Sequence, residues 1–182
     1  VHLLDLPGFG KSEAPPADWG TSDYADLVLS YMDEHKIESA HLVGHSFGGR
    51  IALRIASGHC ERVQALTLIG SHGLQTAAPR GKSWRVRRIA FLRKLLKWAD
   101  SQCGTSYFRD WFTPKFGSQD YLAAGELRGT LVKTVTEDQT ANCREIKAPT
   151  LLLWGSRDKQ TPLELGQRFN ELISDSKLIV LE

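Results

Sequence analysis

The hydrophobic positions in the first 70 residues alternate between two kinds of segment. Short apolar runs bounded by turn residues predict buried strands, and they lie at Val1–Leu4, Ala40–Val43 and Val63–Ile69. Apolar residues at helical spacing predict helices from Thr21 to about His35, with Thr21 or Ser22 as N-cap, and from Phe47 to about Ser57. Strands that alternate with helices are typical of a parallel sheet with right-handed crossovers.

This alternation stops after residue 70 and resumes near the end of the chain. Residues 71–147 contain helix-like segments and turn clusters but no convincing strand. An apolar run at Thr150–Trp154 then predicts a strand, followed by a helix from about Pro162 to Ile173 and a last strand at Lys177–Leu181. We therefore predict one sheet in two pieces, with an insertion between them.

Composition and charge narrow the class of protein. A chain of 182 residues with 41% apolar and 24% charged residues fits a single soluble globular domain. No apolar run approaches the roughly 20 residues of a membrane helix. The net charge of +2 is too small to indicate nucleic-acid binding. Cys60, Cys103 and Cys143 are widely spaced without a C-x-x-C pair, which favours reduced thiols in a cytoplasmic protein.

The first chemical candidate is the glycine-rich stretch "DLPGFGKS" at residues 5–12. A phosphate-binding loop requires G-x-x-x-x-G-K-[ST], but Asp5 stands at the position of the first glycine, and Pro15-Pro16 follow where a helix should begin. The D-x-P-G motif of GTPases also fits, but the chain has no guanine-reading N-K-x-D. We therefore do not predict a nucleotide site.

The second candidate is G-x-S-x-G, which occurs at residues 44–48 between a predicted strand and a predicted helix. A serine in such a tight turn needs a strained backbone, and we expect Gly44 and Gly48 to prevent clashes with neighbouring side chains. The turn would place the Ser46 hydroxyl near the positive end of the helix, with the N–H of Phe47 as oxyanion donor. A glycine-rich turn with a solvated serine is the alternative, which this position disfavours.

Three segments, in this order, resemble the α/β-hydrolase fold family in its serine-nucleophile, esterase-like branch. "DLPGFGKS" resembles the family's D-x-x-G-x-G-x-S segment, "GHSFGG" (with His45) its nucleophile elbow, and "PTLLLWGSRDKQTP" the strand and loop that usually hold the triad acid. The resemblance covers most of the chain. It implies an α/β fold with a mostly parallel sheet, core segments at 1–70 and 148–182, and a helical cap insertion at 71–147.

The resemblance also implies a Ser-His-Asp triad with Ser46 as nucleophile and Asp158 as acid. The alternative for Asp158 is a turn carboxylate that caps the following helix. Glu164 and Asp175 lie in or after that helix, which we expect to place them at the wrong end. The family's histidine follows the last strand; of the six histidines here, only His72 follows a strand near the right edge, and it remains a candidate substitute base.

We expect the chain to be a fragment of such a hydrolase, truncated at both ends. It ends at Glu182, before the place of the family's triad histidine. It begins at Val1, after the place of the loop that supplies the second oxyanion N–H. We therefore expect that histidine and that donor to lie outside this chain, and the fragment to be inactive by itself.

The insertion contains a basic helical stretch at residues 82–99. Its apolar residues share one helical face, and Lys and Arg lie elsewhere on the helix. Such a helix can lie over the core with its charges in water, or on an anionic membrane. We favour the cap, because the position of the stretch explains it without a lipid.

These residues predict hydrolysis of a carboxylic ester or related acyl bond. The histidine would act as base and then acid, oriented by Asp158. The alternatives are a C–C bond hydrolase, thioesterase or acyltransferase of the same fold, and a non-catalytic ligand-binding homologue. We expect a small-molecule ester or acyl substrate, no metal or organic cofactor, and neither nucleic acid nor a membrane as partner; the oligomeric state is left open.

Overall fold

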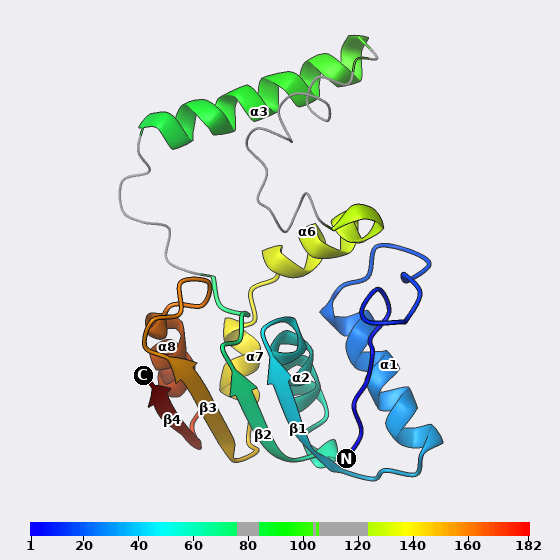
Figure 1. Ribbon diagram of the computed structural model, residues 1–182, viewed down its shortest axis with the longest axis vertical. Helices are drawn as coiled ribbons and strands as arrows, with labels where there is room; N and C mark the ends of the chain where they lie inside the picture. The colour runs from blue at the N-terminus through cyan, green and yellow to red at the C-terminus, as the bar shows by residue number, and fades with distance from the viewer. Residues whose placement is uncertain (76–83, 104, 106–123) are drawn as a thin grey trace.

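The computed structural model describes residues 1–75, 84–103, 105 and 124–182. At its centre lies a parallel sheet of four strands in the order β1 (Ala40–His45), β2 (Val63–Ile69), β3 (Thr150–Gly155) and β4 (Ser176–Leu181) (Figure 1). Each strand pairs with the next along the chain, so all four carboxyl ends lie at one edge. Four of the five predicted strands and the parallel sheet are thus confirmed.

Helices cover one face of this sheet and leave the other open in the described residues (Figure 1). α2 (Phe47–Gly58) packs on β1 and β2, and α8 (Leu163–Leu172) packs on β3 and β4. α1 (Thr21–Glu34) packs against α2, and α7 (Thr140–Glu145) contacts both α2 and α8. The fully buried side chains between these layers include Leu53, Leu66, Leu68, Leu152 and Phe169.

The described residues of the predicted insertion at 71–147 are mostly helical. It contains α3 (Trp84–Cys103), the short 3-10 helix η3 (Gly125–Leu127), α6 (Arg128–Thr136) and α7. A further 3-10 helix, η1 (Cys60–Arg62), precedes β2. α3 and α6 lie beyond the carboxyl ends of the strands (Figure 1). None of the described helices is both long enough and apolar enough to cross a membrane. The division into core and cap at 71 and 147 stays a prediction.

The predicted strand at Val1–Leu4 is wrong. These residues have no partner strand among the described residues, and their side chains are exposed, Leu3 at 92%. In Figure 1 this segment runs between β1 and α1 without pairing with either. A strand is stabilised by a ladder of hydrogen bonds to a neighbour. An apolar run without such a neighbour therefore does not become a strand.

The helix predicted from Thr21 is confirmed as α1, but its N-cap is Gly20 instead of Thr21 or Ser22. The Asp23 carboxylate accepts the N–H of Gly20 at 2.6 Å. Thr21 is fully buried, and its N–H and hydroxyl both donate to the Glu137 carboxylate just after α6. A contact with a residue distant in sequence thus takes the threonine that local capping rules would assign to the cap.

Candidate active site

Ser46 lies in the turn between β1 and α2, at the carboxyl edge of the sheet. β1 ends at His45 and α2 begins at Phe47, so Ser46 alone makes the connection. Its φ of +48° and ψ of −108° are a conformation that residues with a side chain rarely adopt. Its N–H donates to the Ile69 carbonyl at 3.1 Å, which holds the turn against β2. This strained strand-to-helix turn is the geometry expected for a projecting serine nucleophile.

Two glycines make this turn sterically feasible, and only one of them was predicted. A Cβ added to Gly44 would lie 2.7 Å from the carbonyl carbon and oxygen of Gly48, which are backbone atoms that cannot rotate away. A Cβ on Gly49 would collide with the buried side chain of Ser71. A Cβ on Gly48 would meet nothing within 4 Å, so the prediction that Gly48 prevents a clash is wrong. The close approach is between β1 and the side of α2 that carries Gly49.

Phe47 opens α2 and contributes one of the first N–H groups of this helix, which have no acceptor within it. These groups and the helix dipole favour negative charge beside Ser46. The Phe47 ring stacks on the Phe9 ring, with 5.1 Å between the ring centroids, and meets the Tyr24 ring edge-on, with 5.2 Å between the centroids. The side chain of Phe47 therefore packs against other aromatic rings. Its backbone N–H remains the group with a chemical role, and that role as oxyanion donor stays a prediction.

The glycine-rich stretch at residues 5–12 forms a turn that Asp5 closes. The Asp5 carboxylate accepts the N–H of Lys11 at 3.2 Å, and its carbonyl accepts the hydroxyl of Ser12 at 2.6 Å. A Cβ on Gly10, whose φ is +56°, would collide with the same carboxylate. The inside of the turn thus holds a negative charge, which explains physically why it is no phosphate cradle.

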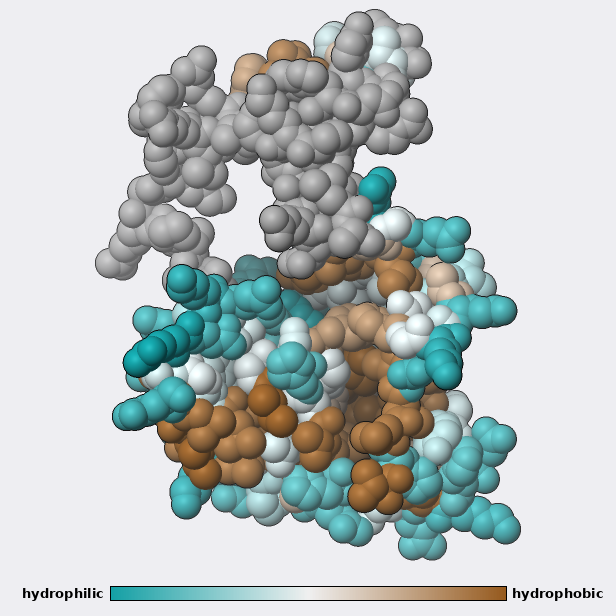
Figure 2. All heavy atoms as spheres, viewed as in Figure 1, coloured by the Kyte–Doolittle hydropathy of each residue, from teal (hydrophilic) through white to brown (hydrophobic). Residues whose placement is uncertain are grey.

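A cleft of about 420 Å³ opens beside the nucleophile turn. Its walls are mainly apolar and consist of Leu4, Leu6, Phe9, His45, Ser46, Phe47 and Gly48. Figure 2 shows apolar surface gathered on this face of the molecule, over the N-terminal segment and β1. Ser46 therefore faces an apolar space.

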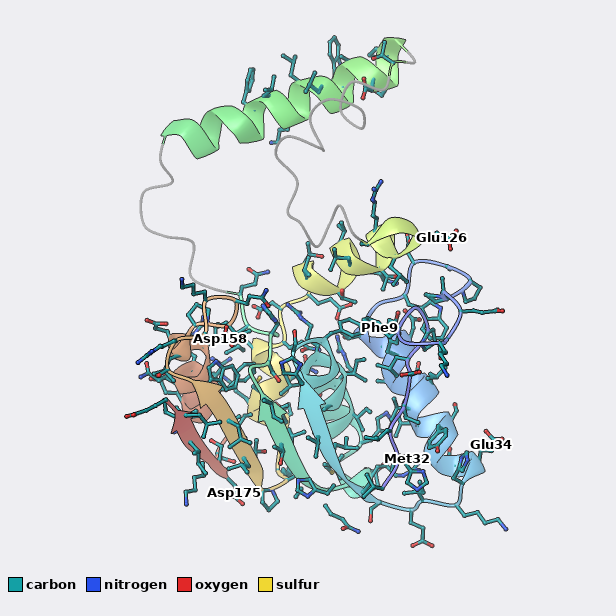
Figure 3. All side chains as sticks on the ribbon, viewed as in Figure 1. Phe9, Met32, Glu34, Glu126, Asp158 and Asp175 are labelled. Carbon is teal, nitrogen blue, oxygen red and sulfur yellow. The ribbon has the colours of Figure 1, made fainter. Side chains whose placement is uncertain are left out.

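Asp158 lies in the loop after β3, at the same edge as the nucleophile turn (Figure 3). Its Oδ1 accepts the backbone N–H groups of Gln160 at 2.8 Å and Thr161 at 2.9 Å, and its Oδ2 accepts the Thr161 hydroxyl at 2.5 Å. These donors, the Thr161 hydroxyl first, lower the pKa of Asp158 from its ordinary 3.8, so the carboxylate is ionised at neutral pH. The N-cap of α8 is Pro162, so the alternative that Asp158 caps this helix is wrong.

The two other acids considered for this role differ in position. Asp175 precedes β4 at the opposite edge of the sheet, as predicted (Figure 3). Glu164 lies in the first turn of α8 with an exposed side chain. A helix that follows a parallel strand begins at the carboxyl edge, so the prediction that Glu164 lies at the wrong end is incorrect. Its exposure still sets it apart from Asp158.

His72 is the histidine that the structure brings to Asp158. It is half-buried in the segment after β2, and its positive charge contributes to the lowered pKa of Asp158. In the same segment, a Cβ added to Gly70 would lie 3.3 Å from Asp158 Oδ2. The role of His72 as a substitute base stays a prediction. The other histidines with described side-chain partners contact Tyr31 (His2 and His35), Thr67 (His41) and Glu61 (His59).

Sequence reasoning missed a buried polar network that ties the insertion to α2. Arg50 is 6% exposed and donates to the carbonyls of Thr134 at 2.8 Å and Glu137 at 3.1 Å, at the end of α6. The Glu137 carboxylate in turn binds Thr21 at the start of α1. Because α2 begins at the nucleophile turn, this network fixes α6 relative to Ser46. No local pattern could indicate it, since its partners are distant in sequence.

The described residues favour neither a cysteine nucleophile nor a metal site over Ser46. Cys60 is exposed and Cys143 buried, and both are free thiols. Burial raises the pKa of Cys143 to about 12, so this thiol stays protonated and is no nucleophile. Within the described ranges, no group of three or more His, Cys, Asp or Glu side chains is placed to hold a metal ion. Ser46 remains the candidate nucleophile.

The whole chain matches one known protein family. The family described as the alpha/beta hydrolase fold matches residues 1–182. The chain belongs to the alpha/beta hydrolase fold family. The fold class predicted from the three sequence segments is thereby confirmed.

Relatives within this family have names that describe hydrolases. A 2-hydroxy-6-oxononadienedioate/2-hydroxy-6-oxononatrienedioate hydrolase of Paraburkholderia phymatum is 30% identical over 188 residues, which cover 92% of this chain and 63% of the relative. A 2-hydroxymuconate semialdehyde hydrolase of Pseudomonas sp. strain CF600 is 45% identical over 75 residues, 41% of this chain and 26% of the relative. This chain therefore spans less than two thirds of the length of these relatives.

The solved structure of a meta-cleavage product hydrolase of Pseudomonas fluorescens IP01 is similar in fold. It superposes with a TM-score of 0.63 at 24% identity, over 97% of this chain and 68% of that chain. At this identity the likeness supports the fold of the alpha/beta hydrolase family and does not extend to a substrate.

Proposed function

We propose that the protein is a serine-nucleophile hydrolase that cleaves a carbon–carbon bond in a 2-hydroxy-6-oxo-dienoate. The observation that carries the proposal is the similarity to relatives named as hydrolases of such compounds, at 30% identity over 92% of this chain and 45% over 75 residues. The sequence-based prediction put an ester or related acyl bond first and gave C–C hydrolysis as an alternative. The similarity to these relatives favours the alternative.

The chemistry of such a substrate requires a C–C bond to break. A 2-hydroxy-6-oxo-dienoate contains hydroxyl, oxo and carboxylate groups but no ester or amide. Its conversion to the 2-oxo form moves the hydroxyl proton to C5 and leaves an enone that can accept the electron pair of the C5–C6 bond. Water then supplies OH to C6, which becomes a carboxylic acid, and H to the carbon fragment that leaves.

The described residues would supply three of the groups that this reaction needs. Ser46 Oγ would attack the C6 carbonyl, and the N–H of Phe47 would stabilise the oxyanion that forms. A histidine, oriented by the ionised Asp158, would take the Ser46 proton and return it to the leaving carbon fragment, which leaves C6 bonded to Ser46 as an ester. Water would then cleave this ester, giving OH to C6 and the proton back to Ser46 Oγ. Support comes from the strained turn at Ser46 and the lowered pKa of Asp158 at the same edge of the sheet. We further propose that the insertion at 71–147 covers this edge as a cap.

Hydrolysis of a carboxylic ester is the second candidate. The observation that favours it is the apolar cleft beside Ser46, whose walls Leu4, Leu6 and Phe9 suit an aliphatic or aromatic acyl group. The same nucleophile and acid would act on an ester carbonyl. The two reactions therefore differ in the substrate and in the bond that breaks, and they share the catalytic residues.

Turnover of both substrate classes by the complete protein, including whatever its reading frame encodes beyond this chain, tests the proposal. We expect kcat/KM for a 2-hydroxy-6-oxo-dienoate, followed by loss of its dienol absorbance, to exceed that for p-nitrophenyl butyrate by about 100-fold or more. Ser46→Ala should abolish both activities. A faster ester reaction would favour the second candidate, and no turnover of either would favour a non-catalytic homologue.

A further inference from the structure

We propose that Thr161 is a positioning residue for Asp158, because this buried threonine binds both carboxylate oxygens and leaves one direction free for the triad histidine. The inference rests on the proposed function, in which Asp158 is the triad acid. It concerns a residue outside the G-x-S-x-G motif and three positions after the acid itself.

The hydrogen bonds at Asp158 determine which acceptor position stays free. A carboxylate oxygen has two lone-pair sites. Oδ1 accepts two backbone N–H groups, from Gln160 at 2.8 Å and Thr161 at 2.9 Å, which occupy both of its sites. Oδ2 accepts the Thr161 hydroxyl at 2.5 Å, which occupies one. A further donor therefore has one site left, on Oδ2, and Thr161 sets the direction of that site.

Thr161 can impose this direction because it is itself fixed. Its side chain is 2% exposed, whereas Asp158 is half-buried. Its carbonyl accepts the indole N–H of Trp154 at 2.9 Å, and Trp154 is 1% exposed on β3. Trp154 packs so closely on α8 that a Cβ added to Gly166 would lie 2.8 Å from the indole ring. The orientation of the acid is thus anchored in the core.

The same hydroxyl acts on the charge of the site. It is the largest cause of the lowered pKa of Asp158, followed by the N–H of Thr161. The N–H of Gln160 and the positive charge of His72, in the segment after β2, contribute in the same direction, and burial opposes them. Removing the hydroxyl leaves a more basic carboxylate, which holds the protonated histidine more strongly. The acid limb of the activity profile should then move to higher pH.

Two variants of the complete protein separate the hydroxyl from the shape of the side chain. Thr161→Val keeps the branched shape and loses the hydroxyl, and Thr161→Ser keeps the hydroxyl. We expect Thr161→Val to lower kcat about tenfold and to raise the acid-limb pKa of kcat/KM by a few tenths of a pH unit or more. Thr161→Ser should stay within about threefold of the parent in kcat with an unchanged profile. Trp154→Phe, which loses the anchoring N–H together with part of the packed ring, should change both in the same direction but less than Thr161→Val.

The outcomes distinguish this inference from the proposed function. If Ser46→Ala and Asp158→Asn are inactive but Thr161→Val matches the parent in kcat and pH profile, the inference fails and the proposed function stands. Equal losses in Thr161→Val and Thr161→Ser with an unmoved pH profile would indicate packing alone and also overturn it. If Thr161→Val does not fold, an unmoved kcat and pH profile in Trp154→Phe has the same meaning. Full activity of Ser46→Ala would overturn both.

Discussion

The nucleophile turn at residues 44–49 and the acid turn at residues 155–161 lie at the same edge of the sheet but are built differently. The nucleophile turn depends on backbone shape, with Ser46 at a φ of +48° and a missing Cβ at Gly44. The acid turn depends on side-chain hydrogen bonds, with Asp158 bound by Thr161. A turn that has no room for a Cβ at a fixed position leaves a short sequence motif, whereas a hydrogen-bonded loop leaves little that a motif can describe.

Gly44→Ala in the nucleophile turn is expected to have the largest effect on stability. The added Cβ would lie 2.7 Å from backbone atoms of Gly48 and Gly49, which have to move. We expect a loss of roughly 3 kcal/mol in the free energy of unfolding, measured by urea denaturation, together with loss of activity.

Gly48→Ala is the matched control for this prediction. Its Cβ would meet nothing within 4 Å, and alanine is favoured over glycine in a helix. We expect a stability within about 1 kcal/mol of the parent or slightly above it. Equal destabilisation by the two substitutions would mean that steric fit at Gly44 does not define the turn.

Asp158→Asn tests the acid turn while preserving its shape, because an amide oxygen can still accept the N–H groups of Gln160 and Thr161. We expect kcat to fall by about 10³- to 10⁴-fold, since a neutral amide does not stabilise the protonated histidine. Steady-state kinetics at neutral pH measures this. Activity within a few-fold of the parent would exclude Asp158 as the triad acid.

The same substitution has a pH-dependent effect on stability. The folded-state pKa of Asp158 is lowered from 3.8, so its ionised form stabilises the folded state above about that pH. This contribution is lost as the pH falls from about 4 through the lowered pKa. The stability difference between the parent and Asp158→Asn should therefore be constant above about pH 5 and decrease below pH 4.

His72→Gln is expected to have the smallest effect. His72 acts on Asp158 through its charge, which is the last of the contributions to the lowered pKa. We expect kcat within about threefold of the parent and an Asp158 pKa that is slightly less lowered, measured by NMR titration. A loss of activity as large as that of Asp158→Asn would instead identify His72 as the catalytic base. The acid and the base would then both lie in the loops after β2 and β3.

Local pattern predicted four strands of the sheet and the turn that carries Ser46, because periodicity and motif are properties of residues close in sequence. It failed at Val1–Leu4, where an apolar run has no partner strand among the described residues, and at Thr21, which Glu137 binds from across the chain. The supports of Asp158 were missed for a different reason. Thr161 lies within the quoted segment, but only its burial and contact with Trp154 distinguish it from an ordinary loop threonine.

The proposed function requires that Ser46 of the complete protein is the nucleophile, and covalent labelling tests this directly. Treatment with a fluorophosphonate, followed by peptide mass mapping, should find the label on Ser46 of the parent and none in Ser46→Ala. Gly48→Ala should still label, which controls for disturbance of the turn. A parent that does not label, or a label that persists in Ser46→Ala, would contradict the assignment of Ser46 and with it the proposed function.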